Sequence, residues 1–234
     1  MSLVQVSRTD GAAVVAFARP PANAFNLALV EEFSAWLEEL SNAPPRDGLI
    51  ITGSGAAFSG GVDFKEAPRY SPDQKRRMVQ AINRTITLLY GFPGATVAAV
   101  NGHAIGGAFV VMLGCDARLG ARSADTKLAL SEVTAGIPYP ACPMEVVKAE
   151  LQPQVRRILV LTGKAISPEE AHALGIIDEL VPPDRLIARA VEVARSRSAL
   201  PSYLRVKEQL KRDTLRRMSE IVATRDDPML DHWV

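Results

Sequence analysis

Residues 49–64 read "LIITGSGAAFSGGVDF", and this stretch decides the class of fold that the chain adopts. Its first part, "LIITG", is a short apolar run followed by glycine, which is typical of a strand buried on both faces. Its second part, "SGGVD", is a glycine-rich loop ending in an acid. Glycines after a strand indicate that the backbone bends sharply or that another group approaches it closely.

The same design occurs a second time, at residues 95–114. "ATVAAV" predicts a buried strand, "NGHAIGGA" is the second glycine loop, and "GGAFVVMLG" predicts a helix of small and apolar residues. Free N–H groups at the start of a helix carry partial positive charge. One N–H group from each loop would together stabilise an enolate or another oxyanion. In the absence of a ligand, the two loops would be tight turns only.

The rest of the chain predicts strands and helices in alternation, followed by helices alone. A hairpin turns at Asp10 and Gly11, and apolar periodicity predicts a helix from residue 27 to the prolines at 44 and 45 and another from residue 73. "ARLGA" at 117–121 predicts a strand, and "SPEEAHALG" at 167–175 predicts a capped helix. Residues 184–198 and 202–222 predict two charged helices. We therefore expect an α/β fold, with a core over residues 1–180 and a helical C-terminal extension over 181–234.

The composition is that of an ordinary globular protein. The 234 residues are 47% hydrophobic and 23% charged, with a net charge of +1, so nothing suggests a nucleic-acid or membrane-surface partner. The N-terminus lacks a basic region followed by an apolar run, and polar and glycine residues interrupt the apolar stretch at 95–113. We expect a cytoplasmic protein with no membrane partner. Cys115 and Cys142 form no motif and are expected to be buried thiols, and the cysteines and histidines show no metal-ligand spacing.

Two other readings of the first glycine loop are weaker. A dinucleotide-binding fingerprint would start at Gly53 and Gly55, but its third glycine would fall on Phe58, and the acid twenty residues on, Asp73, does not end a strand. The loop is also not a nucleophile elbow, so Ser59 is expected to be an ordinary loop residue.

Four segments in register resemble the crotonase (enoyl-CoA hydratase/isomerase) superfamily. "AFSGGVDFKE" at 57–66 is similar to the first signature loop of that family, and "AAVNGHAIGGAF" at 98–109 is similar to the second. "PPANAFNLALVEEF" at 20–33 and "LTGKAISPEEAHALGIIDELVP" at 161–182 resemble two further family segments. The resemblance runs in order from about Val4 to Val193 and so covers most of the chain.

The resemblance implies the crotonase/ClpP-like fold of ββα repeats, assembled as a homotrimer or homohexamer. It also implies an acyl-CoA thioester as substrate, with no cofactor beyond the coenzyme A that the substrate carries. By position, the N–H groups of Val62 and Gly107 would hold the thioester oxygen. The residues that match the CoA-contacting and pocket segments of the family are Asn23, Ala24, Asp63, Phe64, Lys65 and Gly106.

The family's hydratases use two glutamates, and here only one is present. The first position, three residues after Gly107, is Val110, which cannot transfer a proton. The second falls on Glu132 in "LALSEVTAGIPYP", whose apolar setting predicts partial burial and a raised pKa, as suits a general base. One glutamate facing two N–H donors favours a Δ3,Δ2-enoyl-CoA isomerase. The alternatives are an enoyl-CoA hydratase using Glu132 alone and a non-catalytic acyl-CoA-binding protein.

Other residues could add to this site. Tyr139, between two prolines, could line the acyl pocket or serve in packing alone. His103 lies in the second glycine loop, His172 in the capped helix, and Glu145 on an expected helix. Each of these three is expected to be structural or at the surface.

Overall fold

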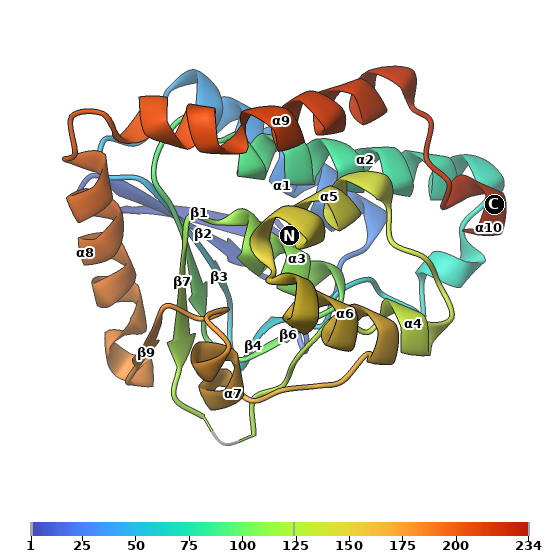
Figure 1. The fold of residues 1–234 in the computed structure, drawn as a ribbon, viewed down its shortest axis with the longest axis horizontal. Helices are drawn as coiled ribbons and strands as arrows, with labels where there is room; N and C mark the ends of the chain where they lie inside the picture. The colour runs from blue at the N-terminus through green and yellow to red at the C-terminus, as the bar shows by residue number, and fades with distance from the viewer. Residues whose placement is uncertain (1, 124, 234) are drawn as a thin grey trace.

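A computed structural model describes residues 2–123 and 125–233. In this part of the chain a main sheet of six strands lies beside a smaller sheet of three (Figure 1). The main sheet pairs β1 with β2 antiparallel, and all its other pairs are parallel. In spatial order its strands are β1 (Val4–Thr9), β2 (Ala12–Phe17), β3 (Leu49–Gly53), β5 (Thr96–Val100), β7 (Ala117–Ala121) and β9 (Glu179–Val181). The small parallel sheet consists of β4 (Ala57–Ser59), β6 (His103–Ile105) and β8 (Leu128–Ala129).

Four successive ββα units build this arrangement, which confirms the predicted fold. In the second, third and fourth units, the first strand joins the main sheet and the next joins the small sheet. The four helices that complete the units are α1 (Leu27–Asn42), α2 (Pro72–Tyr90), α3 (Gly107–Gly114) and α4 (Glu132–Ala135). A 3-10 turn at Ala67–Arg69 precedes α2.

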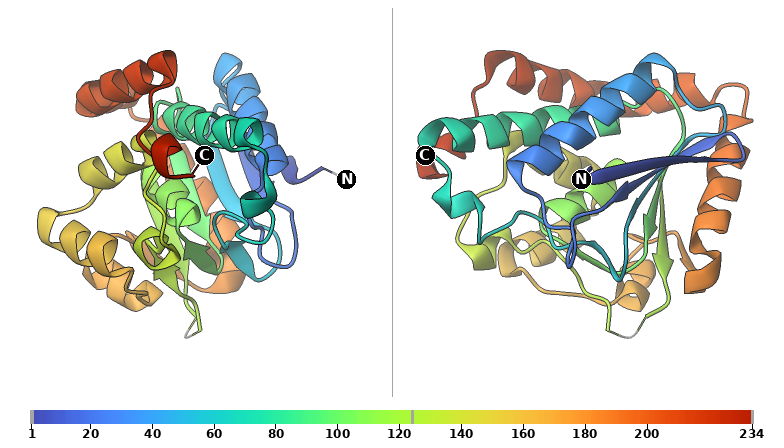
Figure 2. Two further views of the ribbon diagram at one scale, coloured as in Figure 1. Left: turned by 90° about the vertical axis from the view of Figure 1, so that its right-hand side faces the viewer. Right: turned by 180° about the vertical axis from the view of Figure 1, so that it is seen from behind.

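The inner strands of the main sheet are buried on both faces, as "LIITG" predicted, whereas the edge strand β1 is largely exposed. Leu49 and Ile51 belong to the large core beneath α1, α2, α3 and α5 (Ala141–Glu150), whereas Ile50 between them belongs to a second core. That second core is covered by α8 (Leu186–Ser198), which packs against four strands of the sheet (Figure 2). Successive residues of a strand point to opposite faces, so one apolar run supplies both cores.

Helices follow the last unit. They are α5, α6 (Pro153–Thr162), α7 (Pro168–Ala173), α8, α9 (Tyr203–Thr224) and α10 (Leu230–Trp233). The predicted start of α8 at residue 184 was two residues early, because Pro183–Arg185 form a 3-10 turn. The predicted capping box at Ser167 is present. The boundary at residue 180 stays a prediction; β9, which ends at Val181, pairs with β7 of the core.

Buried charges fix α9 to the rest of the fold. The Asp116 carboxylate, at the start of β7, accepts hydrogen bonds from Lys207 and Lys211 of α9, both at 2.7 Å. Burial alone would raise the pKa of Asp116, but the two ammonium groups outweigh it and lower that pKa to about 2. After α9, buried Asp227 accepts a hydrogen bond from Asn83 of α2 at 2.7 Å.

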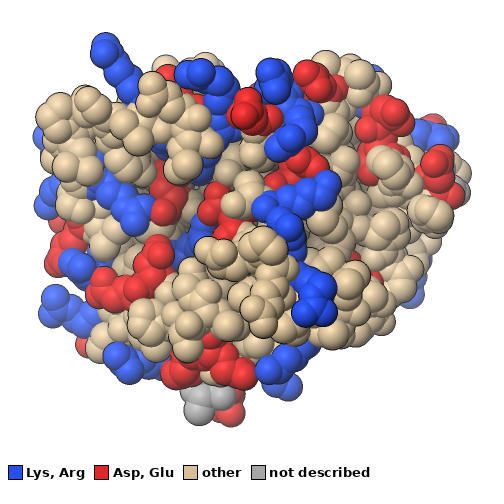
Figure 3. Space-filling model, in the orientation of Figure 1, with Lys and Arg blue, Asp and Glu red and all other residues tan. Residues whose placement is uncertain are grey.

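The distribution of surface charge and the burial of the two thiols match what the composition predicted. Lysine and arginine are interspersed with aspartate and glutamate over the face in Figure 3. Cys115 and Cys142 are buried and free, as predicted, and burial raises the pKa of each thiol, to about 12 and about 11. Among the described helices, none combines the length and the apolar composition that a membrane crossing needs.

Candidate active site

The small sheet brings together the three predicted catalytic positions. Its strands β4, β6 and β8 are neighbours and run parallel, so their carboxyl ends meet at one edge. The chain leaving β4 leads to Val62, the chain leaving β6 leads to Gly107, and the chain leaving β8 leads to Glu132. These three residues line one pocket of about 250 Å³, which we call the glycine pocket and whose other lining residues include Gly60, Gly61, Phe64, Ile105, Gly106 and Ser131.

The two glycine loops touch at Gly61. This residue has φ of +75°, a left-handed conformation that favours glycine. A Cβ at this position would lie 2.3 Å from the carbonyl oxygen of Ile105 and 3.5 Å from the nitrogen of Gly107. The glycines predicted that another group would come close to the backbone. Part of that group is the second glycine loop, which packs against the first at Gly61.

The N–H groups of Val62 and Gly107 are both free. Phe25 brackets Val62: its N–H donates to the carbonyl of Gly61 at 2.7 Å, and its carbonyl accepts from the N–H of Asp63 at 2.9 Å. Gly107 is the first residue of α3, where an N–H has no intrahelical acceptor and carries partial positive charge. Within the described ranges, neither N–H donates to a protein acceptor.

Glu132 faces these donors from the first turn of α4. Its side chain is 7% exposed, and its Oε1 lies close enough to Gly106 that a Cβ there would be 3.2 Å away. Gly106, with φ of +56°, thus leaves room for the carboxyl group. Burial raises the pKa of Glu132, as the apolar setting predicted.

Tyr139 approaches Glu132 from the loop after α4. Its hydroxyl faces the carboxyl and offsets part of the rise in the Glu132 pKa. The pair does not reach hydrogen-bond geometry, and among the described residues both Glu132 Oε2 and the Tyr139 hydroxyl are buried without a partner. Tyr139 therefore lies next to the Glu132 carboxyl group. The spacing of these two residues in the sequence did not predict that they would be neighbours.

A second, apolar pocket adjoins the first. It has a volume of about 40 Å³ and shares Val62 and Gly107 with the glycine pocket. Val110, fully buried on α3, forms part of its wall. The position that holds a glutamate in the family's hydratases therefore belongs here to an apolar cavity. The remaining lining residues are Phe25, Leu29, Val30, Phe33, Ile82, Thr85, Ile86, Val111 and Pro143.

The predicted CoA-contacting residues surround the loop after β4. The buried side chain of Asn23 donates to the carbonyls of Ser54 and Ala57, so this segment offers a ligand its backbone rather than that side chain. Phe64 is 47% exposed and Lys65 is exposed beside it. The role of all these residues in binding CoA stays a prediction.

Sequence reasoning missed Arg19, which joins the two segments. It donates to the carbonyl of Ala24 at 3.0 Å and forms ion pairs with Asp63 at 2.7 Å and Glu66 at 2.8 Å. Burial would raise the pKa of Asp63, but hydrogen bonds from Arg19 and from two backbone N–H groups lower it. An arginine just before a predicted loop gave no periodic or motif signal.

The other candidates lie outside both pockets. Glu145 is held by Lys148 at 2.8 Å and by Arg217 at 3.1 Å. His172 bonds through Nδ1 to the carbonyl of Ile177. His103 Nδ1 accepts the N–H of Lys127 at 3.0 Å. Over the described ranges, no cluster of three or more histidine, cysteine or acidic side chains could hold a metal ion.

Fold and site together define an α/β protein of the crotonase superfamily, with ββα units and a glutamate opposite two free N–H groups. Residues 7–232 match the family model described as enoyl-CoA hydratase/isomerase. The chain belongs to that family.

Relatives of the chain carry both activities in their names. Enoyl-CoA delta isomerase 1 of human mitochondria is 28% identical over 96% of this chain and 74% of its own length. The probable enoyl-CoA hydratase EchA17 of Mycobacterium tuberculosis is 29% identical over 81% of this chain and 72% of its own. Among solved structures, human mitochondrial delta3-delta2-enoyl-CoA isomerase matches with a TM-score of 0.88 at 26% identity, covering 99% of this chain and 90% of that one. The probable enoyl-CoA hydratase EchA3 of M. tuberculosis matches with a TM-score of 0.85 at 26% identity, covering 94% and 93%.

Proposed function

We propose that the protein is a Δ3,Δ2-enoyl-CoA isomerase that works with a single carboxylate. One observation carries this proposal. Over residues 2–123 and 125–233, Glu132 is the one ionisable side chain that lines the glycine pocket or the apolar pocket. A reaction that moves one proton between two carbons of the same substrate needs one such group, whereas adding water across a double bond calls for a group that activates the water.

The reaction would run in two proton transfers. The thioester oxygen accepts hydrogen bonds from the N–H groups of Val62 and Gly107, which form the oxyanion hole. The Glu132 carboxylate takes a proton from C2 of the 3-enoyl thioester, and the negative charge moves to the thioester oxygen as the enolate forms. The protonated carboxyl then delivers the proton to C4, which leaves the double bond between C2 and C3. No cofactor takes part beyond the coenzyme A of the substrate.

The surroundings of Glu132 support this use of it. Its burial raises its pKa, which makes the ionised carboxylate a stronger base than one in water. An oxyanion donor is worth roughly 3 kcal/mol of the barrier. Val110 turns the neighbouring wall apolar, so no second side chain is placed there to activate water for hydration.

The test compares two substrates and two glutamates. Wild type and Glu132→Gln are assayed for isomerisation of 3-hexenoyl-CoA and for hydration of crotonyl-CoA, with Glu145→Gln as the control outside both pockets. We expect isomerisation by wild type, a loss of at least a thousandfold in Glu132→Gln, and less than a threefold change in Glu145→Gln. Hydration without isomerisation would replace the proposal with the hydratase alternative. Thioester binding with neither reaction would favour the non-catalytic alternative.

Assembly into a homotrimer or homohexamer remains part of the proposal. It is supported by apolar side chains exposed on α9, where Leu204, Val206 and Leu210 are 43%, 56% and 81% exposed. Exposed apolar surface of this kind marks places where proteins interact. Light scattering coupled to size-exclusion chromatography would give the molar mass, and a 25.2 kDa particle would contradict the expected assembly.

A further inference from the structure

Three neighbouring pockets share lining residues in succession through the candidate active site. An outer pocket of about 540 Å³, lined in part by Ala22, His103 and Lys127, shares Gly60 and Ile105 with the glycine pocket. The glycine pocket in turn shares Val62 and Gly107 with the apolar pocket. A linear ligand that lies on the two free N–H groups would therefore extend into the outer pocket at one end and into the apolar pocket at the other.

The two ends of this row differ in polarity, which orients the ligand. In the outer pocket His103 accepts a hydrogen bond at Nδ1, so the neutral ring carries its proton on Nε2 and can donate it. The charged side chains of Lys127 and Asp125 line the same pocket, which makes this end polar. Among the described residues that line the apolar pocket, the one polar side chain is that of Thr85, which donates its hydroxyl to the carbonyl of Val30 at 3.4 Å. The CoA arm, with its amides and phosphates, suits the outer end, and the hydrocarbon tail suits the apolar end.

The apolar pocket is short. Its volume is about 40 Å³, and a cavity needs roughly 10–15 Å³ to hold one water-sized group. About three such groups fit, which corresponds to about three carbon atoms of a chain. We propose that the apolar pocket restricts the enzyme to short-chain 3-enoyl thioesters and that the side chain of Ile82 closes the far end of this pocket. This inference rests on the proposed isomerase function.

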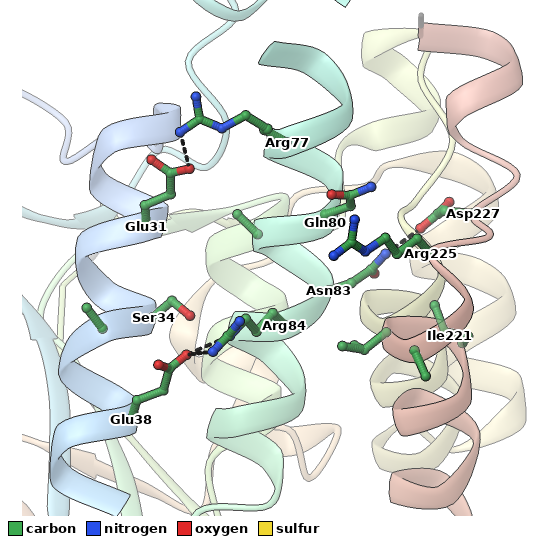
Figure 4. Close-up of a pocket in the computed structure, with 14 residues that line it drawn as sticks. Glu31, Ser34, Glu38, Arg77, Gln80, Asn83, Arg84, Ile221, Arg225 and Asp227 are labelled. Carbon is green, nitrogen blue, oxygen red and sulfur yellow. Dashed lines mark hydrogen bonds and ion pairs between the residues drawn. The ribbon is translucent and has the colours of Figure 1, made fainter. Parts of the chain in front are cut away.

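Behind Ile82 lies a much larger space. A groove of about 630 Å³, which we call the α1–α2 groove, runs between these helices and the end of α9 (Figure 4). Ala81 and Asn83 line this groove, whereas Ile82 between them lines the apolar pocket. On α1, Ser34 lines the groove while the preceding residue, Phe33, lines the pocket. The seam between α1 and α2 is thus the wall that separates the two spaces.

Two ion pairs on the groove side of this wall join its helices. Ion pairs join Glu31 to Arg77 at 2.7 Å and Glu38 to Arg84 at 2.6 Å, and Figure 4 shows both spanning from α1 to α2. Ile82 takes no part in these ion pairs, and its side chain is only partly buried. Its truncation would therefore open the pocket toward the groove without removing a polar link between the helices.

The experiment measures chain-length preference in three proteins: wild type, Ile82→Ala and Ile187→Ala. Ile187 is the matched control, because it is a partly buried isoleucine on α8 that packs against the other core. The measured quantity is kcat/KM for 3-hexenoyl-CoA and for 3-dodecenoyl-CoA, each below its micelle concentration. If both chains found apolar room, each added methylene would raise kcat/KM about fourfold. We expect instead that wild type and Ile187→Ala prefer the hexenoyl substrate at least tenfold, and that Ile82→Ala shifts this ratio at least tenfold toward the dodecenoyl substrate.

Either of two results would overturn the inference: a wild type that turns over the dodecenoyl substrate as well as the hexenoyl one, or a folded Ile82→Ala protein with an unchanged ratio. Failure of the proposed function looks different, because neither substrate would then be isomerised. In that event the Kd values of saturated hexanoyl-CoA and dodecanoyl-CoA, measured by calorimetry on the same three proteins, carry the same test. If wild type bound hexanoyl-CoA more tightly than dodecanoyl-CoA and Ile82→Ala reversed this preference, the inference of a short pocket would hold although the protein is not an isomerase.

Discussion

Substitution of Gly61 by alanine perturbs the point where the two glycine loops meet. The new Cβ would stand 2.3 Å from the carbonyl oxygen of Ile105, and real Cβ atoms essentially never come within 3.0 Å of a neighbour. One of the loops must therefore move by about 0.7 Å or more. Because that carbonyl is backbone and lies two residues before Gly107, the movement changes the distance between the two free N–H groups.

The expected loss in activity follows from that displacement. Loss of one oxyanion donor costs about 10²–10³ in rate, or ~3–4 kcal/mol, and a misplacement of about 1 Å in a catalytic site can cost roughly a hundredfold. We therefore expect kcat/KM for 3-hexenoyl-CoA to fall about a hundredfold to a thousandfold in Gly61→Ala, mainly through kcat.

Gly55→Ala is the matched control, because Gly55 also has a positive φ, +73°, but a Cβ there would meet nothing within 4 Å. Both variants bear the left-handed strain of about 1–2 kcal/mol, offset by about 0.4–1 kcal/mol from the stiffer unfolded chain. Only Gly61→Ala also bears the collision. Urea unfolding at pH 7 measures this difference in stability, and kcat/KM should change less than threefold in Gly55→Ala. If folded Gly61→Ala retained activity within threefold of Gly55→Ala, the contact of the loops would not set the position of the donors.

Three further outcomes are expected. Because burial raises the pKa of Glu132, the folded protein keeps a proton that the unfolded chain releases, and stability falls as pH rises between the two values. Glu132→Gln should therefore raise Tm at pH 8 and leave it nearly unchanged at pH 4; equal Tm values at pH 8 would contradict this. Tyr139→Phe removes a hydroxyl that lowers the Glu132 pKa, so the acidic limb of the kcat/KM profile should shift to higher pH, and an unshifted limb would show that the hydroxyl does not act on the carboxyl. Asp116→Asn leaves Lys207 and Lys211 buried without their carboxylate, so unfolding at pH 7 should cost about 3–5 kcal/mol less. The Asp116 contribution is complete above the unfolded pKa of ~4 and fades as pH falls toward its folded pKa of about 2, which acid unfolding of both proteins would reveal.

Long elements could be predicted from the sequence because their patterns repeat. The helix over 27–42 buries apolar residues at spacings of three and four, and the strand over 49–53 is a continuous apolar run. The cap at Ser167 was visible because hydroxyl, proline and glutamate occupy adjacent, fixed positions. In each case the residues that form the pattern, and the interactions that produce the element, lie close together in the sequence.

The strands that position the site could not be predicted in this way. β4, β6 and β8 have only two or three residues each, too few to show an alternation of buried and exposed side chains. Their pairing joins residues far apart in the chain, such as Ile105 and Ala129. Motif resemblance named the residues of the site, but the reason that they meet, three parallel strands ending at one edge, is tertiary. The same holds for Tyr139 beside Glu132.

Burial of Glu132 explains both the chemistry that the site favours and the chemistry that it lacks. A carboxylate in water is a weak base, and its removal from water raises its pKa and so makes it a stronger base. With Val110 in the adjoining wall, the described residues that line the two pockets include no second ionisable side chain to activate water. Among the described residues Glu132 Oε2 has no hydrogen-bond partner, so burying the ionised carboxylate on folding costs free energy. A buried carboxyl group with an unpartnered oxygen, in a pocket that it shares with two free N–H groups, supports the proposed function of Glu132 in proton transfer.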